Sequence, residues 1–161
     1  MIKETLLQIS DNFKNLSNEV KNIEVASSLM IGSLKKKKKI IYCGNGGSAA
    51  DSQHLAAELV GRYRKNRQAL SAIALTTDTS VITAVGNDFA FDQIFSRQID
   101  AIGSEDDILY AISTSGKSKN IIMAIDAARK KKMKVIGLTG EKENEMKDKC
   151  DIVIKVPANR P

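Results

Sequence analysis

The chain has 161 residues, of which 42% are hydrophobic and 27% charged, and its formal net charge is +6. This length suits one domain with a proper core, and the composition is ordinary for a globular protein, which excludes disordered and fibrous classes. No apolar run reaches the roughly 18 residues that a membrane helix needs, and the N-terminus lacks the apolar region of a secretory signal. We therefore expect a cytoplasmic protein with no membrane partner.

The positive charge raises nucleic acid as a partner, but the excess lies in two lysine runs, residues 35–39 and 130–132. Each run comes where a helix is expected to end, and cations are favoured at helix C-termini. Three Tyr, four Phe and no Trp leave little aromatic surface for base stacking. The runs are interpreted as solvated helix ends, and nucleic acid is not expected as a partner. Of the two cysteines, Cys43 is expected to be a buried thiol, and neither lies in a CxxC pair.

Residues 2–34 are predicted to be helical. Apolar residues recur there at alternating spacings of three and four: Leu6, Ile9, Phe13, Leu16, Val20 and Ile23. This is the a/d pattern of a packed helix, but it is too short for a free coiled coil. The helical segment is expected to pack either on its own domain or on another subunit, and only the second option predicts an oligomer.

Residues 39–156 alternate short apolar runs with amphipathic stretches. The predicted strands are 40–43, 71–76, 107–113, 134–140 and 151–156, and the predicted helices are about 48–63, 79–85, 91–101, 118–132 and 142–149. Continuous apolar strands separated by helices indicate an α/β fold with a doubly wound, five-stranded parallel sheet flanked by helices. Such sheets bind ligands outside the carboxyl ends of their strands.

A glycine-rich loop follows the first predicted strand and opens a helix. Its candidate ligand-binding residues are Asn45, Gly46, Gly47 and Ser48. Glycines let backbone N–H groups approach an anion closely, and Ser48 is a plausible N-cap and hydroxyl donor.

A dinucleotide site is the main rival interpretation of this loop, because Gly44, Gly46 and Ala49 match G-x-G-x-x-A. That fingerprint also needs an acidic residue about 20 residues later. The only candidate, Asp78, comes much later than that. We therefore expect no nucleotide cofactor.

The loop after the third predicted strand carries four hydroxyls and a glycine within six residues. Its members are Ser113, Thr114, Ser115, Gly116, Lys117 and Ser118. Many neutral donors at a helix start, with a lysine close by, suit a phosphate monoester. An ordinary serine-capped helix would need only one of these hydroxyls, so the pattern predicts a phosphate site.

His54 and Glu58 are four residues apart on the helix after the glycine-rich loop, so they face the same side. Such a pair can bind a metal, hold a general base beside its partner, or form a plain surface ion pair. Arg62 follows and could neutralise substrate charge. Asn87 and Asp88 lie between apolar residues further on, where they could bond sugar hydroxyls or form a turn.

These features together resemble the SIS (sugar isomerase) domain and, within it, the phosphoheptose isomerases of bacteria. The stretches that carry the resemblance are CGNGGSAADSQHLAAELVGRYRKNR, AVGNDFAFDQIFSRQ, DILYAISTSGKSKNI and KVIGLTG, and it runs from about residue 2 to Val156. The resemblance implies conversion of sedoheptulose 7-phosphate to D-glycero-D-manno-heptose 7-phosphate through an enediol. It also implies an entry step to the heptoses of lipopolysaccharide, carried out by cytoplasmic homotetramers with active sites between subunits.

The resemblance also assigns roles to residues. Glu58 matches the base, while Ser113, Thr114, Ser115 and Ser118 match the phosphate loop. The matches to sugar-contacting positions are Asn45, Ser48, Arg62 and Asp88. His54 and Glu58 match residues that bind zinc in some members. The family continues past the last strand into a helix with Gln-Glu-x-x-His, which completes the metal site, whereas this sequence ends at Pro161. We expect this chain to bind a phosphosugar with impaired or absent turnover.

Three other functions remain open at this point. A related protein that associates with the DnaA replication initiator shares the fold but lacks the glutamate at the position of Glu58. A regulatory SIS module would sense a phosphosugar without reacting. A third alternative is an isomerase for shorter sugar phosphates, since the loops do not define sugar length.

Overall fold

A computed structural model of the chain describes residues 1–158, and Pro161 lies outside the described residues. Five parallel strands form one sheet in the order β2-β1-β3-β4-β5. Their bounds are β1 Ile40–Gly44, β2 Ala72–Ala74, β3 Ile108–Ser113, β4 Lys134–Gly140 and β5 Ile152–Val156. The predicted five-stranded parallel sheet is confirmed, with β2 shorter than expected.

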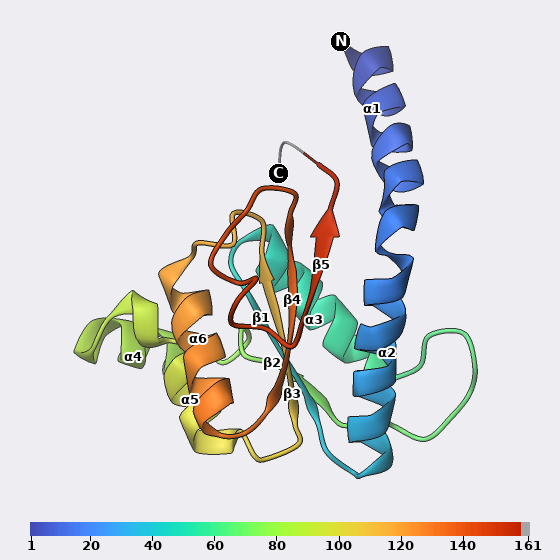
Figure 1. Ribbon diagram of the computed structural model, residues 1–161. Coiled ribbons are helices and arrows are strands. Elements are labelled where there is room, and N and C mark those ends of the chain that lie inside the picture. The colour runs from blue at the N-terminus through green and yellow to red at the C-terminus, as the bar shows by residue number, and fades with distance from the viewer. Residues whose placement is uncertain (159–161) are drawn as a thin grey trace.

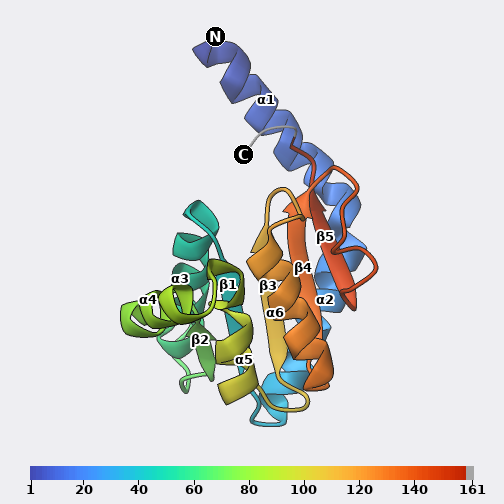
Figure 2. The ribbon, with the colours of Figure 1, turned by 90° about the vertical axis from the view of Figure 1, so that its left-hand side faces the viewer.

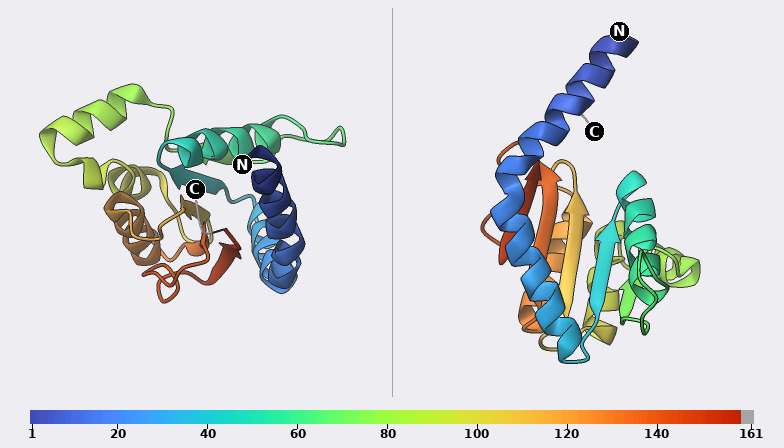
Figure 3. Two further views of the ribbon diagram at one scale, coloured as in Figure 1. Left: turned by 90° about the horizontal axis from the view of Figure 1, so that it is seen from above. Right: turned by 90° about the vertical axis from the view of Figure 1, so that its right-hand side faces the viewer.

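Helices cover both faces of the sheet (Figures 1 and 3). The α-helices are α1 Ile2–Asn15, α2 Val20–Lys35, α3 Gly47–Val60, α4 Thr79–Asp88, α5 Ser96–Ile102 and α6 Lys119–Lys130, and two short 3-10 helices are η1 Leu16–Glu19 and η2 Phe91–Gln93. Helices α2 and α3 lie on one face, and α5 and α6 lie on the other. The sheet is therefore doubly wound, as predicted.

The central strands are apolar on both sides because both of their faces are covered. On β1, Ile41 and Cys43 face α5 and α6, whereas Ile40 and Tyr42 face α2 and α3. Each fully buried side chain of this size contributes about 1.5–3 kcal/mol relative to an exposed one. Cys43 is a buried thiol, as expected, and burial raises its pKa, which keeps the thiol protonated.

The N-terminal helical segment is two α-helices rather than one. The 3-10 turn η1 interrupts it, and there the Glu19 carboxylate accepts a hydrogen bond from the Lys155 backbone N–H on β5. Beyond that turn α1 projects past the sheet (Figure 1), and no residue of α1 is buried. Phe13 is 73% exposed. Within residues 1–158, nothing buries the a/d stripe of α1.

The predicted helix at 142–149 is wrong, because these residues form turns. The Asn144 side chain accepts a hydrogen bond from the Met146 N–H and donates one to the Lys142 carbonyl. Such local side-chain bonds compete with helical backbone bonds. The segment also offers only one buried apolar side chain, Met146, so it lacks the apolar face that would hold a helix on the sheet.

Both lysine runs lie where helices end, as interpreted from the sequence. α2 ends at Lys35 and α6 at Lys130, and the chain turns at Lys37 and Lys132 with positive φ. Ion pairs join three of these lysines to acids at the same edge of the sheet: Lys36–Asp106, Lys39–Asp107 and Lys132–Glu105. Within residues 1–158, no helix combines the length and apolar character that crossing a bilayer requires.

Candidate functional site

The candidate site lies at the carboxyl ends of β1 and β3, which are neighbours in the middle of the sheet. β1 continues into α3 on one face, and β3 continues into α6 on the other (Figure 2). The loop at residues 45–47 and the loop at residues 113–118 therefore leave the sheet in opposite directions. In open α/β sheets this switch point is where ligands bind.

The 113–118 loop, here called the phosphate loop, closes as a tight turn. Ser113 Oγ accepts a hydrogen bond from the Gly116 N–H at 3.1 Å and lies 3.2 Å from Ser118 Oγ. Ser115 Oγ accepts from the Lys117 N–H at 3.2 Å. Ser118 is the N-cap of α6, so the first N–H groups of that helix point out of the turn without intrahelical acceptors. The loop thus places several hydroxyls beside a helix N-terminus, a combination that favours anion binding.

The phosphate loop is held from beneath by the end of β4. The Gly140 N–H donates to the Thr114 carbonyl at 3.0 Å. Gly116 has a φ of +63°, and a Cβ built on it would lie 2.1 Å from Asn144 Cγ. Asn144 is itself fixed by a 3.0 Å hydrogen bond from its Nδ2 to Thr139 Oγ1. The turns that replace the predicted helix at 142–149 therefore support the loop.

The 45–47 loop, here called the sugar loop, makes an equally tight turn into α3. A Cβ at Gly44 would lie 2.5 Å from the Ser48 carbonyl oxygen, so only glycine permits this approach. Gly46, with φ +56°, is the N-cap of α3, and Ser48 lies within the first helical turn. The prediction of Ser48 as N-cap was wrong by two residues, because the glycine conformation lets the helix begin earlier.

The start of α3 and the phosphate loop both contribute to one cavity of about 220 Å³. Its lining residues include Ser48 and Asp51 from α3, Thr114 from the phosphate loop, and Leu138, Thr139 and Gly140 from β4. The sequence predicted Ser48 and Thr114 as ligand residues on separate grounds. The structure brings them together over the ends of the central strands.

A buried asparagine that the sequence patterns did not single out connects the two loops. Asn120 is 2% exposed, and its side chain exchanges two hydrogen bonds with the side chain of Asn45. A polar residue on the core-facing side of an otherwise apolar helix start was the available signal. Its partner, however, is 75 residues away in the sequence.

The predicted His54–Glu58 pair forms on α3. His54 Nε2 lies 3.6 Å from Glu58 Oε1, with the histidine side chain 74% exposed and the glutamate side chain 32% exposed. The second oxygen of Glu58 is buried and has no hydrogen-bond partner among residues 1–158. An uncompensated carboxylate oxygen costs free energy unless a ligand or partner satisfies it, so Glu58 differs from an ordinary surface acid.

Arg67 secures the end of α3 that carries Glu58. Its guanidinium donates to the carbonyls of Glu58 at 2.8 Å and Leu59 at 2.9 Å. These are carbonyls of the last helical turn, which have no intrahelical donor. The sequence reasoning missed this role, although an arginine shortly after a helix end is a known source of such capping.

The remaining predicted ligand residues are not gathered at the phosphate loop within one chain. Arg62 lies in the exposed loop after α3, whereas Asn87 and Asp88 lie at the end of α4, on the opposite side of the molecule (Figure 3). Asn87 Nδ2 donates to Asp88 Oδ1 at 2.8 Å, and both side chains are exposed. Asn87 and Asp88 belong to α4 rather than to a loop turn.

The polar residues after β2 have structural partners. Asp78 is the N-cap of α4, accepting from the Val81 N–H at 2.9 Å. Thr76 and Thr77 each donate to a backbone carbonyl, those of Ala49 and Ala74. These residues therefore fix the connection from β2 to α4.

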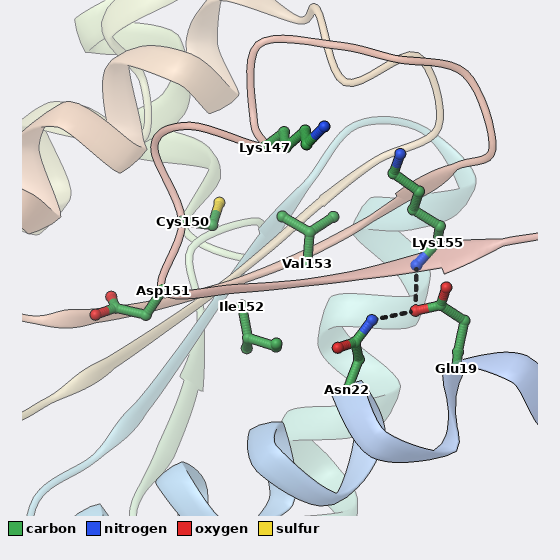
Figure 4. Close-up of a pocket in the computed structure, with 8 residues that line it drawn as sticks. All are labelled: Glu19, Asn22, Lys147, Cys150, Asp151, Ile152, Val153 and Lys155. Carbon is green, nitrogen blue, oxygen red and sulfur yellow. Dashed lines mark hydrogen bonds between the residues drawn. The ribbon is translucent and has the colours of Figure 1, made fainter.

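A larger hollow of about 380 Å³ lies at the edge strand β5, away from the two loops (Figure 4). There Glu19 Oε2 accepts from Asn22 Nδ2 at 2.7 Å and from the Lys155 N–H at 3.3 Å. The second bond satisfies a backbone donor on an edge strand, where unpaired groups invite unwanted pairing. None of the predicted ligand residues lines this hollow, and its hydrogen bonds join the N-terminal helices to the sheet.

A doubly wound sheet with hydroxyl-rich and glycine-rich loops at its switch point defines a class of phosphosugar-binding α/β domains. A family model described as the SIS domain matches residues 6–140. A phosphoheptose isomerase from Akkermansia muciniphila is 49% identical over 158 residues, which cover 98% of this chain and 84% of that protein. The chain therefore belongs to the phosphoheptose isomerases of the SIS domain family.

Solved structures agree with this assignment. A phosphoheptose isomerase from Francisella tularensis superposes with a TM-score of 0.95 at 37% identity, over 99% of this chain and 85% of that one. The enzyme from Neisseria gonorrhoeae gives a TM-score of 0.88 at 40% identity, over 99% of this chain and 88% of that one. The predicted fold class and family are thus confirmed.

Proposed function

We propose that the chain is an aldose–ketose isomerase that converts sedoheptulose 7-phosphate to D-glycero-D-manno-heptose 7-phosphate. The single observation that carries the proposal is the cavity in which Ser48 of α3 meets Thr114 of the phosphate loop. It offers hydroxyls to a phosphate and to sugar hydroxyls at the sheet's switch point. Membership of the phosphoheptose isomerases supports the choice of a seven-carbon sugar.

The reaction moves hydrogen within one molecule and needs no external oxidant or reductant. A base removes a proton from C1 of the ketose, which gives an enediol, and a proton is returned to C2 while O1 loses and O2 gains one. Glu58 is the proposed base, since its carboxylate has one oxygen without a hydrogen-bond partner in the described chain. His54, 3.6 Å away, orients that carboxylate.

The proposed base and the phosphate loop are best supplied by different subunits. Glu58 lies about three turns into α3, roughly 16 Å from the helix start at 1.5 Å per residue. Carbon–carbon bonds are about 1.5 Å long, so C1 and C2 of the substrate lie within roughly 10 Å of its phosphate. This reach is shorter than the distance of Glu58 from the start of α3. The open face of α3 and the uncovered stripe of α1 both support an oligomer, and we propose a homotetramer with sites between subunits.

A zinc ion at His54 and Glu58 would need ligands beyond this pair. Zinc in proteins usually has three or four protein ligands. Among residues 1–158, no group of three His, Cys, Asp or Glu side chains could hold a metal ion. The pair alone does not fit a zinc site, so no step of the proposed reaction depends on a metal.

We also propose that the reaction takes place in the cytoplasm and that its product supplies heptose for lipopolysaccharide. The family resemblance supports both proposals.

Replacing Glu58 tests the proposal. Glu58→Gln keeps the shape of the side chain but removes the base, so turnover of sedoheptulose 7-phosphate should fall by about 100-fold or more while its binding stays within a few-fold. Turnover is measured by NMR of the sugar phosphates and binding by calorimetry. Glu105→Gln, an exposed acid at the opposite edge of the sheet, is the matched control. A wild-type chain that binds no sedoheptulose 7-phosphate, or an unimpaired Glu58→Gln variant, would contradict the proposal.

A further inference from the structure

The sugar loop and the phosphate loop are joined by one pair of side chains. Asn45 Nδ2 donates to Asn120 Oδ1 at 2.9 Å, and Asn120 Nδ2 donates to Asn45 Oδ1 at 2.8 Å. The pairing of β1 with β3 ends at Gly44 opposite Ile112. Beyond that point, within residues 1–158, no backbone hydrogen bond connects the two loops. The amide pair is therefore the direct polar link between them.

The two asparagines are not equivalent. An amide side chain has two N–H donors and an oxygen that can accept twice, and the reciprocal pair uses one donor and one acceptor position on each. Asn120 is 2% exposed, so its remaining capacity does not face the cavity. Asn45 is half-buried, so part of its side chain stays accessible to a ligand. Asn120 thus acts on a ligand only through Asn45.

The sugar loop is shaped by backbone hydrogen bonds within its turn into α3, such as that from the Ser48 N–H to the Asn45 carbonyl at 3.0 Å. These bonds set the shape of the loop but do not connect it to the phosphate loop. The phosphate loop is braced by Gly140 and Asn144. The hydrogen bonds between Asn120, at the start of α6, and Asn45 therefore tie the sugar loop to the elements that hold the phosphate loop.

We propose that Asn120 is a positioning residue that sets the distance between the sugar loop and the phosphate loop. This inference rests on the proposed function, since it assigns sugar binding to one loop and phosphate binding to the other. The hydrogen-bonded pair fixes the separation between the sugar subsite and the phosphate subsite. The site therefore selects ligands whose sugar and phosphate groups are the same distance apart. Inorganic phosphate, which occupies the phosphate loop alone, does not depend on it.

The test compares two ligands on matched variants. Asn120→Ala should weaken the binding of sedoheptulose 7-phosphate about tenfold or more, because two buried hydrogen bonds are lost. Inorganic phosphate should bind within about threefold of its wild-type affinity. Adding Asn120→Ala to Asn45→Ala should cause little further loss, because Asn120 acts only through Asn45. Asn22→Ala is the control. It removes the 2.7 Å hydrogen bond from the Asn22 side-chain amide to Glu19, away from both loops, and should change neither affinity.

An isosteric variant separates hydrogen bonding from packing. Asn120→Asp keeps the volume of the side chain but turns an oxygen toward Asn45 Oδ1, so it should lose sugar phosphate affinity as Asn120→Ala does. This variant also keeps the test valid if the alanine variant fails to fold. Wild-type affinity in Asn120→Asp, or equal losses for both ligands, would overturn the inference.

Failure of the proposed function would be seen separately. If the wild-type chain binds inorganic phosphate but not sedoheptulose 7-phosphate, the proposed substrate is wrong. The coupling of the two loops through Asn45 and Asn120 is then tested by following the backbone NMR signals of residues 45–47 during titration with inorganic phosphate. They should shift in the wild type and stay unchanged in Asn120→Asp. Equal shifts in both proteins would overturn the positioning role.

Discussion

Gly116 shows how one residue controls the phosphate loop. Its φ of +63° is unfavourable for any side chain, and a Cβ would meet the held side chain of Asn144. We expect Gly116→Ala to destabilise the fold by about 1–3 kcal/mol and to weaken phosphosugar binding at least tenfold. Thermal unfolding and calorimetry measure the two effects.

Gly32→Ala is the control for this change. Gly32 lies in α2 with nothing within 4 Å of the added methyl group, and alanine is the better helix former. This variant should be as stable as the wild type or more stable. A Gly116→Ala variant that behaves like Gly32→Ala would mean that the loop tolerates a different conformation.

Asp151 links stability to pH. It accepts the Val135 N–H at 2.9 Å and pairs with Arg129 at 2.7 Å and Lys134 at 3.1 Å. Partial burial raises the pKa of its carboxyl, but the Val135 N–H and the two cations outweigh burial, so the pKa lies below its ordinary value. A lowered folded-state pKa stabilises the fold above the ordinary carboxyl pKa of about 3.9, and this contribution is lost as the pH falls through the folded-state pKa.

Asp151→Asn should therefore lower the free energy of unfolding at pH 7 by about 1–3 kcal/mol, and the difference from the wild type should shrink toward pH 3. Urea unfolding at several pH values measures this. Asp148→Asn changes an exposed acid nearby and should show no such trend. A difference that stays constant with pH would refute the assignment.

The last turn of α3 is held by the guanidinium of Arg67, which donates hydrogen bonds to two carbonyls of that turn. Arg67→Ala should let this turn fray and should lower turnover more than substrate affinity, because Glu58 loses its fixed position. Hydrogen exchange at the end of α3 should rise several-fold. Arg64→Ala, in the same loop but stacked on Tyr63, is the control. Unchanged exchange in Arg67→Ala would contradict the capping role.

Strands were easier to predict than helices. The central strands β1 and β3 are nearly uninterrupted apolar runs because both faces of the sheet are covered there, and this pattern is visible in the sequence. The polar pattern of residues 142–149 between two apolar runs predicts a helix, whereas the side-chain hydrogen bonds of Asn144 fold the segment into turns. The break at η1 depends on Glu19 reaching Lys155. No local pattern reports a contact between segments so far apart.

The candidate site divides in the same way. The sequence suffices to predict Ser113, Ser118 and the glycines as candidate site residues, because they lie in recognisable loop patterns between a strand and a helix. Asn120 and Asn144 act through partners that only the fold brings near. The distance of Glu58 from the phosphate loop depends on the direction of α3, which the sequence pattern alone does not reveal.

The uncovered stripe on α1 leads to a prediction about assembly. Leu6 is 62% and Phe13 73% exposed, and large apolar side chains in a row indicate a surface that another chain covers. Phe13→Glu should shift the proposed tetramer toward smaller species, seen by light scattering after gel filtration, and turnover should fall with it. Asn15→Glu, which places the same charge on the far side of the helix, should leave assembly intact. Unchanged assembly in Phe13→Glu would exclude this stripe as the interface.

The hydrogen bond from the Lys155 N–H to Glu19 has a consequence for biosynthesis. The two residues are 136 positions apart, so all five strands must be almost complete before the bond can form. Helix α2 also packs on β5, which follows the other four strands of the sheet in the chain. Contacts of such long range form slowly, and the part of α2 that packs on β5 stays open to chaperones until β5 is made. Helix α2 thus leaves the ribosome well before one of the strands that covers it.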